Sequence, residues 1–325
     1  MSVSLLTWWG GALASCAGFV LLSPMVARRA PARLASWTLS LGSLVLAAVS
    51  VALPLVLFVA LFGQWGPVAA MGHWSAHLVR DRVSVPVAVL ALGTVVLAGQ
   101  GLLLVRTAWR EGQALSDAWR LARRSAGALV VLPDERPTVF ALPGWPGRIV
   151  AAQQLLQALN PSEIRVVLAH EQAHLDGRHE LHRAAVSLAS ALNPMLRPAR
   201  GAISLATERW ADERAAMVVG DRALVARTIG HVAQVCGREI PVSPSMAAAG
   251  PGVALRVEAL LAPPLGRRVL LTATLAVLAL VPAGAAVHAL GQTNDLFQRA
   301  ERAYGTSAPV TTPLTSISTK ASEHP

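Results

Sequence analysis

Four apolar segments constrain this 325-residue chain most, because each is long enough to cross a lipid bilayer. A helix needs roughly 20 apolar residues to span the hydrocarbon core. The segments are residues 5–26, 35–62, 83–105 and 269–290. The whole composition agrees, since 54% of the residues are hydrophobic and only 14% are charged. We therefore expect a mainly α-helical integral membrane protein with about four transmembrane helices.

The arginines lie beside these apolar segments, and their positions predict the topology. They are Arg28, Arg29 and Arg33 after the first segment, Arg106, Arg110, Arg120, Arg123 and Arg124 after the third, and Arg267 and Arg268 before the last. Positively charged loops stay in the cytoplasm, so we expect residues 107–267 to be cytoplasmic. The loop 63–82 and the tail 291–325 then lie outside. The tail is rich in Ser, Thr and Pro, which predicts disorder.

The net charge of +10 is a second consequence of these arginines. Such a charge suits nucleic acid, but arginines beside membrane spans set topology and meet anionic lipid instead. We therefore expect the lipid bilayer as a partner and no nucleic acid. The cysteines, Cys16 and Cys236, do not have metal-type spacing and receive no role.

Residues 170–174 read His-Glu-Gln-Ala-His, a complete HExxH motif. Residues four apart share one face of a helix, so His170 and His174 can bind one metal ion. Glu171 lies beside them, where a carboxylate can act as general base on a metal-bound water. The pattern is typical of a metallopeptidase with Zn²⁺ as its cofactor.

The surrounding sequence predicts that this motif lies on a helix. Asn160, Pro161 and Glu163 form a helix start, with Asn as the N-cap and Pro at the first helical position. Apolar residues within 164–169 follow at helical spacing, and Gly177 is a suitable end. The alternative is a charged helix end that carries two histidines by chance. The predicted helix around the motif favours the metal site over this alternative.

Glu208 is the candidate for the third metal ligand. It lies on a second expected helix, residues 203–219, which ends at Gly220. Asp212 is four residues later on the same face, where it can hydrogen-bond the outer nitrogen of a ligand histidine. Without the HExxH motif, these carboxylates would indicate an exposed face paired with arginines. With it, we predict Glu208 as a ligand and Asp212 as its support.

Glu180 is the alternative third ligand. Residues 170–180 read HExxHxxGxxE, and metzincins have a ligand histidine at that last position. A glutamate is not the usual ligand there, and no Met-turn follows, which makes this alternative weaker. We expect His179 and His182 at the rim of the site. Together with Arg209 they are candidates for contacting the substrate or the oxyanion.

Between the third apolar segment and the motif, three short runs indicate strands: residues 129–132, 138–142 and 148–151. A strand beside an HExxH helix offers an edge on which an extended peptide can lie. A hairpin that only covers the helix is the alternative. Residues 181–195 form an apolar run too short to span, so we expect a buried or membrane-dipping helix. Residues 253–261 predict a further short helix.

The chain resembles the membrane metallopeptidases of the beta-lactam sensor-transducers, the BlaR/MecR type, in a short form. The matching runs are residues 140–144, 148–150, 166–179, 208–212 and 255–261, the last followed by Pro263 and Pro264. Three spans before the motif and one after it also match that family's layout. The resemblance implies a bacterial cell membrane, zinc held by His170, His174 and Glu208, and Glu171 as the general base.

The resemblance further implies a zinc-dependent endopeptidase that acts in regulated proteolysis or signalling. Its substrate would be a cytoplasmic or membrane protein, with a transcriptional repressor as one candidate. The sensors of that family continue into an external penicillin-binding domain, whereas about 35 residues follow the last span here. One alternative is a quality-control protease resembling HtpX, which typically has two spans on each side of the site. The other is a non-catalytic signalling scaffold, whose mark would be a lost Glu171 or histidine.

These observations divide the chain into four parts. Residues 1–106 are expected to hold three transmembrane helices with short loops. Residues 107–267 are expected to form a cytoplasmic, zincin-like α+β zinc metallopeptidase domain around the HExxH helix. Residues 268–290 are the fourth transmembrane helix, and residues 291–325 are the external disordered tail.

Overall fold

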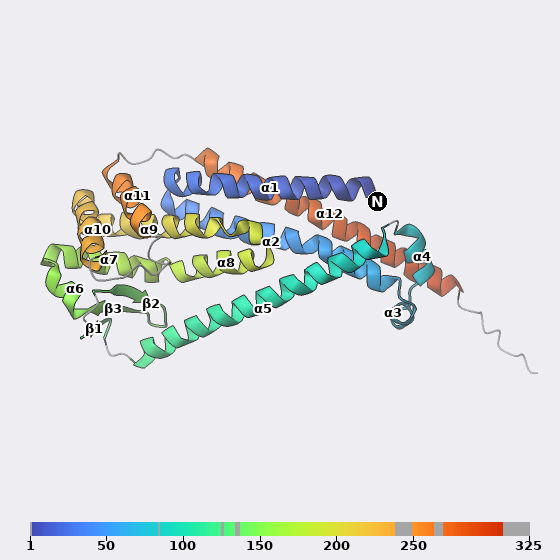
Figure 1. Ribbon diagram of the computed structural model, residues 1–325, viewed down its shortest axis with the longest axis horizontal. Coiled ribbons are helices and arrows are strands. Elements are labelled where there is room, and N and C mark those ends of the chain that lie inside the picture. The colour runs from blue at the N-terminus through green and yellow to red at the C-terminus, as the bar shows by residue number, and fades with distance from the viewer. Residues whose placement is uncertain are drawn as a thin grey trace, which may run out of the picture.

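The computed structural model describes residues 2–83, 85–124, 127–133, 137–237, 249–262 and 269–307. The described part is mainly helical, with long helices along one axis and a small sheet at one end (Figure 1). Four helices are long and apolar enough to cross a membrane. They are α1 (Ser2–Arg29), α2 (Ala32–Gly63), α5 (Val87–Arg124) and α12 (Val269–Ser307). The expected mainly helical membrane architecture is confirmed.

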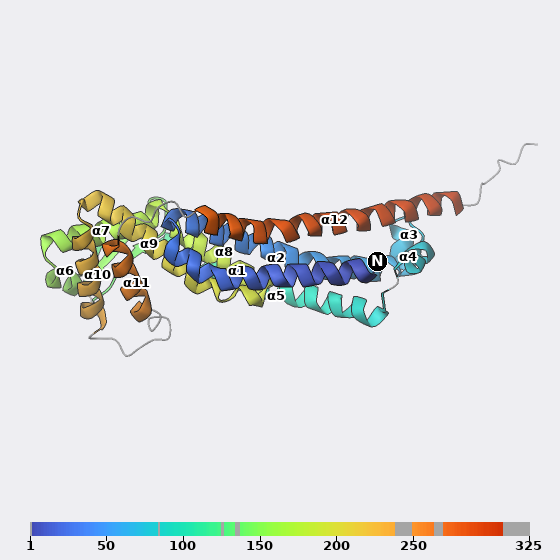
Figure 2. The ribbon, with the colours of Figure 1, turned by 90° about the horizontal axis from the view of Figure 1, so that it is seen from above.

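Helix α2 lies at the centre of the long bundle and packs against α1, α5, α8, α9 and α12. Both views show α1, α2 and α12 running beside one another (Figures 1 and 2). Phe19, Leu39 and Leu275 are fully buried where these helices meet. Gly42 lies under the Phe19 ring, since a Cβ at that position would come within 2.5 Å of it. Small residues of this kind allow membrane helices to approach closely.

Helix α5 extends beyond the end that the sequence predicted. It continues to Arg124 without a break, so the predicted domain boundary at residue 106 does not coincide with a helix end. Residues 107–124 are mostly Ala, Leu, Arg, Glu and Gln, all good helix formers, which explains why the helix does not stop where the apolar run stops. The third candidate span and the following segment are therefore one continuous helix.

Helix α12 also extends further than predicted. The expectation of disorder from residue 291 is wrong for residues 291–307, which continue the helix. Phe297 and Ala300 pack on Trp74 and Val79, and the backbone N–H of Ser75 donates to the carbonyl of Ala300. This apolar contact stabilises a segment whose polar composition alone indicated disorder.

The segment between α2 and α5 forms two short helices, α3 (Gly66–Met71) and α4 (Ala76–Arg82). Helix α4 packs on α2 and α12 at the end of the bundle far from the sheet (Figure 1). Residues 308–325 of the predicted external tail lie outside the described residues.

The sheet has the strand order β1-β3-β2. Its strands are β1 (Leu129–Leu132), β2 (Val139–Leu142) and β3 (Arg148–Ala152), which confirms the predicted strands to within one residue. Strand β3 pairs with β1 in parallel and with β2 in antiparallel orientation. The central strand is almost fully buried, and α7 packs against both β2 and β3. Strand β2 is therefore a sheet edge next to α7.

Six helices and a 3₁₀ turn complete the end of the molecule that holds the sheet. They are α6 (Gln153–Ala158), α7 (Pro161–Asp176), α8 (His179–Leu192), η1 (Pro194–Leu196), α9 (Ala199–Val219), α10 (Arg222–Gly237) and α11 (Ala249–Leu261). Helix α8 is held between α2, α5 and α9, so the short apolar run from residue 181 is a buried helix. Asn193 and Pro194 end it, as predicted.

The ends of α7 and α9 confirm the capping signals in the sequence. The Asn160 side chain accepts hydrogen bonds from the backbone N–H groups of Ser162 and Glu163, and the Glu163 carboxylate accepts from the N–H of Asn160. This capping box satisfies donors that the first helical turn leaves free. Helix α9 ends at Gly220, whose φ of 80° is the left-handed conformation that glycine adopts without strain.

Candidate metal centre

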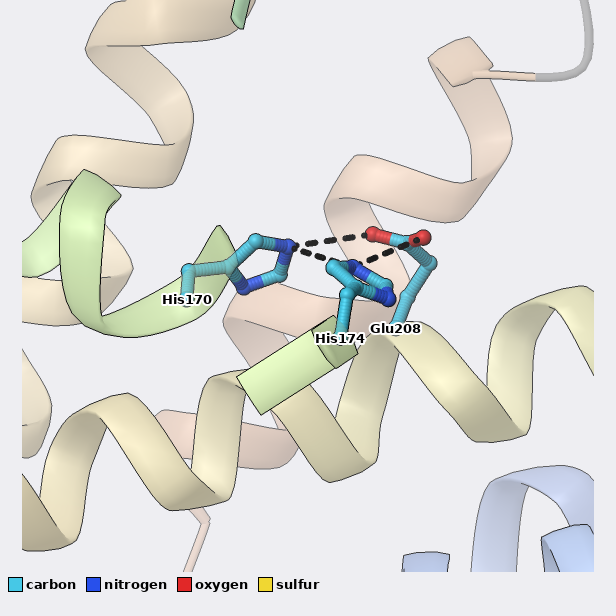
Figure 3. Close-up of side chains that lie close together, drawn as sticks. All are labelled: His170, His174 and Glu208. Carbon is cyan, nitrogen blue, oxygen red and sulfur yellow. Dashed lines mark hydrogen bonds and ion pairs between the residues drawn. The ribbon is translucent and has the colours of Figure 1, made fainter. Parts of the chain in front are cut away.

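Helices α7 and α9 pack against each other and bring the three predicted ligands together. His170, His174 and Glu208 each offer one ligand atom, and these atoms all lie within 4.8 Å of one another. Figure 3 shows the two imidazoles and the carboxylate converging. Ala211 and Ala215 are fully buried on α9, and their small side chains permit the close approach of the helices.

The spacing of the three donor atoms fits one zinc ion. Nε2 of His170 lies 3.1 Å from Nε2 of His174 and 3.4 Å from Oε2 of Glu208. Nε2 of His174 lies 3.5 Å from Oε1 of Glu208. Tetrahedral ligands at zinc bond lengths of about 2.0–2.2 Å are separated by roughly 3.3–3.5 Å. Two imidazoles, one carboxylate and a fourth open position are a donor set found in catalytic zinc sites.

Asp212 lies against the outer nitrogen of His170, which is the position that the sequence predicted for it. Its Oδ1 is 2.9 Å from Nδ1 of His170, and its side chain is almost fully buried. Arg256 of α11 donates two hydrogen bonds of 2.7 Å to the Asp212 carboxylate, and its Nη1 lies 3.2 Å from Oε2 of Glu208. The bidentate pair fixes the carboxylate, which in turn keeps Nε2 of His170 directed at the site.

Glu171 is the buried carboxylate next to this group. It is 8% exposed, and its carboxylate has a backbone hydrogen bond with Ala141 of the edge strand β2. Burial raises the pKa of Glu171, and the nearby charge of Glu208 raises it further. A general base works best when its pKa is shifted towards the working pH, so this environment suits that role.

The two ligand histidines differ in protonation. Burial lowers the pKa of His170, but hydrogen bonds with Asp212 and Glu208 outweigh burial and raise the pKa to about 10. Burial lowers the pKa of His174 to about 2, with the charge of His170 acting in the same direction. Nε2 of His170 and Nε2 of His174 lie 3.1 Å apart, and both must be unprotonated to bind one metal ion.

His179 fixes the orientation of His174. The Nδ1 atoms of the two rings are 2.7 Å apart, and the ring of His179 also contacts the Trp210 ring at a tilt of 48°, with ring centroids 4.6 Å apart. Burial lowers the pKa of His179 to about 3, so this ring is neutral. In the tautomer that suits metal binding, Nδ1 of His174 carries the proton and donates it to Nδ1 of His179. That tautomer leaves Nε2 of His174 free to bind a metal.

The structure corrects the prediction that His179 and His182 lie at the rim of the site, and it also buries Arg209, the other candidate for contacting the substrate or the oxyanion. All three are buried, with exposed fractions of 1%, 4% and 4%. Nδ1 of His182 contacts the hydroxyl of Ser40 on α2 at 2.7 Å, and Arg209 donates to carbonyl oxygens at the end of α1. The prediction failed because α2 covers His182 and α1 covers Arg209. Contacts between segments so far apart in the chain leave no local sequence pattern.

The structure brings Glu208, and not Glu180, to the two histidines within the part of the chain that it describes. It also reveals two cations that the sequence reasoning missed. The half-exposed Arg183 of α8 has its Nη2 3.3 Å from Nδ1 of His174 and 3.7 Å from Oε1 of Glu208. Arg256 reaches the site from α11, and the only signal for it was its place in a run that carried the family resemblance.

The model of peptidase family M48 matches residues 104–196. This segment includes the sheet, the HExxH helix α7 and helix α8, and it ends before Glu208. No curated protein and no solved structure matches the chain. Over the matched segment the chain is similar to the metalloproteases of family M48, which are hydrolases. Members of this family generally depend on zinc. That similarity agrees with the metal-binding group formed by α7 and α9.

Proposed function

We propose that this protein is a membrane-embedded zinc endopeptidase, with His170, His174 and Glu208 as its metal ligands. The observation that carries the proposal is the convergence of the three donors at zinc spacing, with Asp212 behind one histidine. An incidental charged helix face would not place a buried carboxylate on the outer nitrogen of a ligand imidazole. The match to a metalloprotease family over the HExxH helix supports the same conclusion.

The chemistry follows from the positions of the side chains. Zinc, when bound, supplies a Lewis acid that lowers the pKa of a coordinated water to about 7 and polarises the substrate carbonyl. The Glu171 carboxylate takes a proton from the attacking water and transfers it to the nitrogen of the leaving amine. Arg183 is the half-exposed cation at the site, and we assign it the stabilisation of negative charge on the carbonyl oxygen.

Strand β2 is the proposed docking edge for the substrate. Its other edge is paired with β3, and the strand lies against α7 with Ala141 bonded to the catalytic carboxylate. An extended peptide that adds to β2 is therefore brought beside Glu171. The exposed Phe140 offers an apolar contact for a substrate side chain.

The proposed location is a bacterial cell membrane, with the site facing the cytoplasm. Arg28 and Arg29 end α1, and Arg33 lies in the first turn of α2. Figure 1 shows that these two helix ends lie at the end of the bundle that holds the metallopeptidase domain. A positively charged end of this kind faces the cytoplasm by the positive-inside rule. Loop 63–82 and the end of α12 then lie outside.

Among substrates, we favour a cytoplasmic or membrane protein cut in regulated proteolysis, with a transcriptional repressor as one example. The runs shared with the BlaR/MecR type and the order of three candidate spans before the motif and one after it support this role. A quality-control protease resembling HtpX is the second candidate, since it shares the chemistry. A non-catalytic scaffold is disfavoured, because Glu171 and both histidines are present.

The test uses the full chain purified in detergent, loaded with zinc and supplied with an unstructured fluorescent protein substrate. Glu171→Gln should keep the metal and lose at least about 10²-fold in cleavage rate. Glu180→Gln is the matched control, because Glu180 is a nearby glutamate outside the metal group, and it should cleave normally. Equal cleavage by Glu171→Gln and wild type would remove Glu171 from the mechanism. A zinc-loaded wild type that cleaves nothing would favour the scaffold.

A further inference from the structure

A cavity lies behind the metal centre, where the membrane helices meet the metallopeptidase domain. It has a volume of about 560 Å³, within the usual range of ligand pockets. Its charged and aromatic lining comes from Arg33 of α2, from Arg209, Trp210, Glu213 and Arg214 of α9, from Asp176 at the end of α7, and from Arg222 of α10. This lining is not part of the proposed catalytic group.

The charges of the lining favour an anion. Arg222 forms a bidentate pair with Glu213, so these two residues neutralise each other. The ion pairs of arginines among the described residues involve Arg120, Arg183, Arg222 and Arg256. Within the part of the chain that the structure describes, Arg33, Arg209 and Arg214 therefore line the cavity without a carboxylate at ion-pair distance, and Asp176 is the remaining acid of the lining. Three guanidinium groups around one cavity are a typical setting for a phosphate.

Arg209 is the most unusual of these residues, because it is 4% exposed and carries a full charge. One of its terminal nitrogens donates to the carbonyls of Ala27 and Ala30 at the end of α1, while its Nε is buried without a hydrogen-bond partner. A buried charge is costly unless a counter-charge compensates it. The charges of Glu213 and Asp212 oppose the effect of burial on Arg209 in part, and an anion in the cavity would add to this compensation.

The position of the cavity indicates where the anion comes from. Pro31, Ala32 and Arg33 form one wall, and they connect α1 to α2, both of which are candidate membrane spans. The cavity thus lies at the level where the apolar helices end, which is the level of lipid headgroups. Basic pockets between membrane helices on the cytoplasmic side bind anionic headgroups.

The cavity and the metal centre use opposite faces of α9. Glu208 and Asp212 lie on one face, while Trp210 and Arg214 lie on the other. A chain of contacts joins the two sites: the Arg33 guanidinium lies 5.8 Å from the centroid of the Trp210 ring, which contacts the His179 ring at a tilted angle. His179 in turn contacts the outer nitrogen of the metal ligand His174.

We propose that this cavity, the α2–α9 cavity, is an anion site for the phosphate headgroup of an anionic phospholipid, and that its occupation supports the metal centre. Binding draws Arg33 of α2 and Arg214 of α9 onto one phosphate and so fixes α9 against the membrane helices. Trp210 and His179 transmit this restraint to His174. The binding part stands by itself, whereas the effect on cleavage rests on the proposed peptidase function.

The binding test uses the full chain in nanodiscs of phosphatidylcholine that contain a minor fraction of phosphatidylglycerol. Native mass spectrometry then counts the phosphatidylglycerol that each chain retains. Arg33→Gln/Arg214→Gln removes two exposed arginines of the cavity and should weaken retention about fivefold per arginine. The matched control is Arg106→Gln/Arg110→Gln, which removes two exposed arginines from α5 outside the cavity and should retain the lipid. Equal loss in both double variants, or no retention by wild type, overturns the proposal.

A second arm separates lipid from free phosphate. Inorganic phosphate is titrated into protein in phosphatidylcholine nanodiscs and followed by thermal stabilisation. Weak binding of phosphate compared with retained phosphatidylglycerol supports the lipid headgroup as the source. Stabilisation by phosphate that depends on Arg33 and Arg214, without any phosphatidylglycerol retention, overturns the lipid source.

The activity arm compares cleavage and zinc affinity in discs with and without phosphatidylglycerol. We expect wild type to cleave faster and bind zinc more tightly with the anionic lipid, and the cavity double variant to lose both differences. If no variant cleaves in any lipid but retention still depends on the cavity arginines, the proposed peptidase function fails and the anion site stands. If wild type cleaves equally in both lipids, the coupling is refuted.

Discussion

The pair of Arg256 and Asp212 offers a sharp test of how the metal centre is held, since it was not foreseen from helical spacing. We consider Arg256→Gln, Asp212→Asn and the double variant. In the native protein the guanidinium donates two hydrogen bonds of 2.7 Å to the carboxylate. The side chains of Arg256 and Asp212 are 16% and 2% exposed, so solvent screens the pair little.

The expected magnitude follows from this burial. Removing one partner of a buried pair leaves an uncompensated charge, which costs about 3–5 kcal/mol of unfolding free energy. The double variant removes both charges, so its loss should be smaller than the sum of the two single losses, with a coupling of about 0.5–3 kcal/mol.

Zinc affinity should separate the single variants. Asp212→Asn should weaken it about 10–100-fold, because the residue orients His170. Arg256→Gln should weaken it less, because Arg256 acts on His170 only through Asp212 and also approaches the oxygen of Glu208 that faces His170.

The assay is chemical unfolding of the zinc-free protein in detergent, followed by zinc titration of each variant. A conservative Arg227→Gln variant, at an exposed position of α10, controls for the loss of any arginine. Additive losses in the double variant, to within about 0.5 kcal/mol, would refute the buried pair. An Arg256→Gln protein that loses zinc as severely as Asp212→Asn would contradict the assigned division of roles.

Three further predictions concern α7 and its neighbours. His179→Ala should weaken zinc binding about 10–100-fold by releasing the ring of His174, and a titration that shows unchanged affinity would contradict this. Burial raises the pKa of Glu171 above 4.5, and the base acts only when ionised, so cleavage should fall as pH drops through a midpoint above 4.5. A midpoint of the cleavage rate at or below pH 4.5 would contradict the prediction that burial raises the pKa of Glu171. Asn160→Ala should cost about 0.5–2 kcal/mol of unfolding free energy by removing the N-cap of α7, with no loss of zinc stoichiometry.

Local rules explain why part of this molecule could be predicted from its sequence. The apolar runs located the four long helices, the Asn160 box and Gly220 located helix ends, and short β-rich runs located the strands. The grouping of His170, His174 and Glu208 was predictable because two of these residues share one helical turn and the third lies on a recognisable second helix.

The remaining features depend on contacts between distant segments. His182 was predicted at the rim and Arg209 as a possible contact for the substrate or the oxyanion. Helix α2 covers His182 and helix α1 covers Arg209, which only the packed bundle reveals. The length of α12 depends on Phe297 meeting Trp74, more than 200 residues earlier in the chain. Arg256 reaches Asp212 from a separate helix, and no spacing rule connects the two.

The most direct test of the central claim is the zinc content of the detergent-purified full chain, resupplied with zinc and measured by elemental analysis. Wild type and Glu180→Ala should each hold about one zinc per chain, whereas Glu208→Ala should bind zinc much more weakly. A wild type that holds no zinc would contradict the metal centre. Loss of the metal from Glu180→Ala but not from Glu208→Ala would assign the third ligand to α8 and refute the site described on α7 and α9.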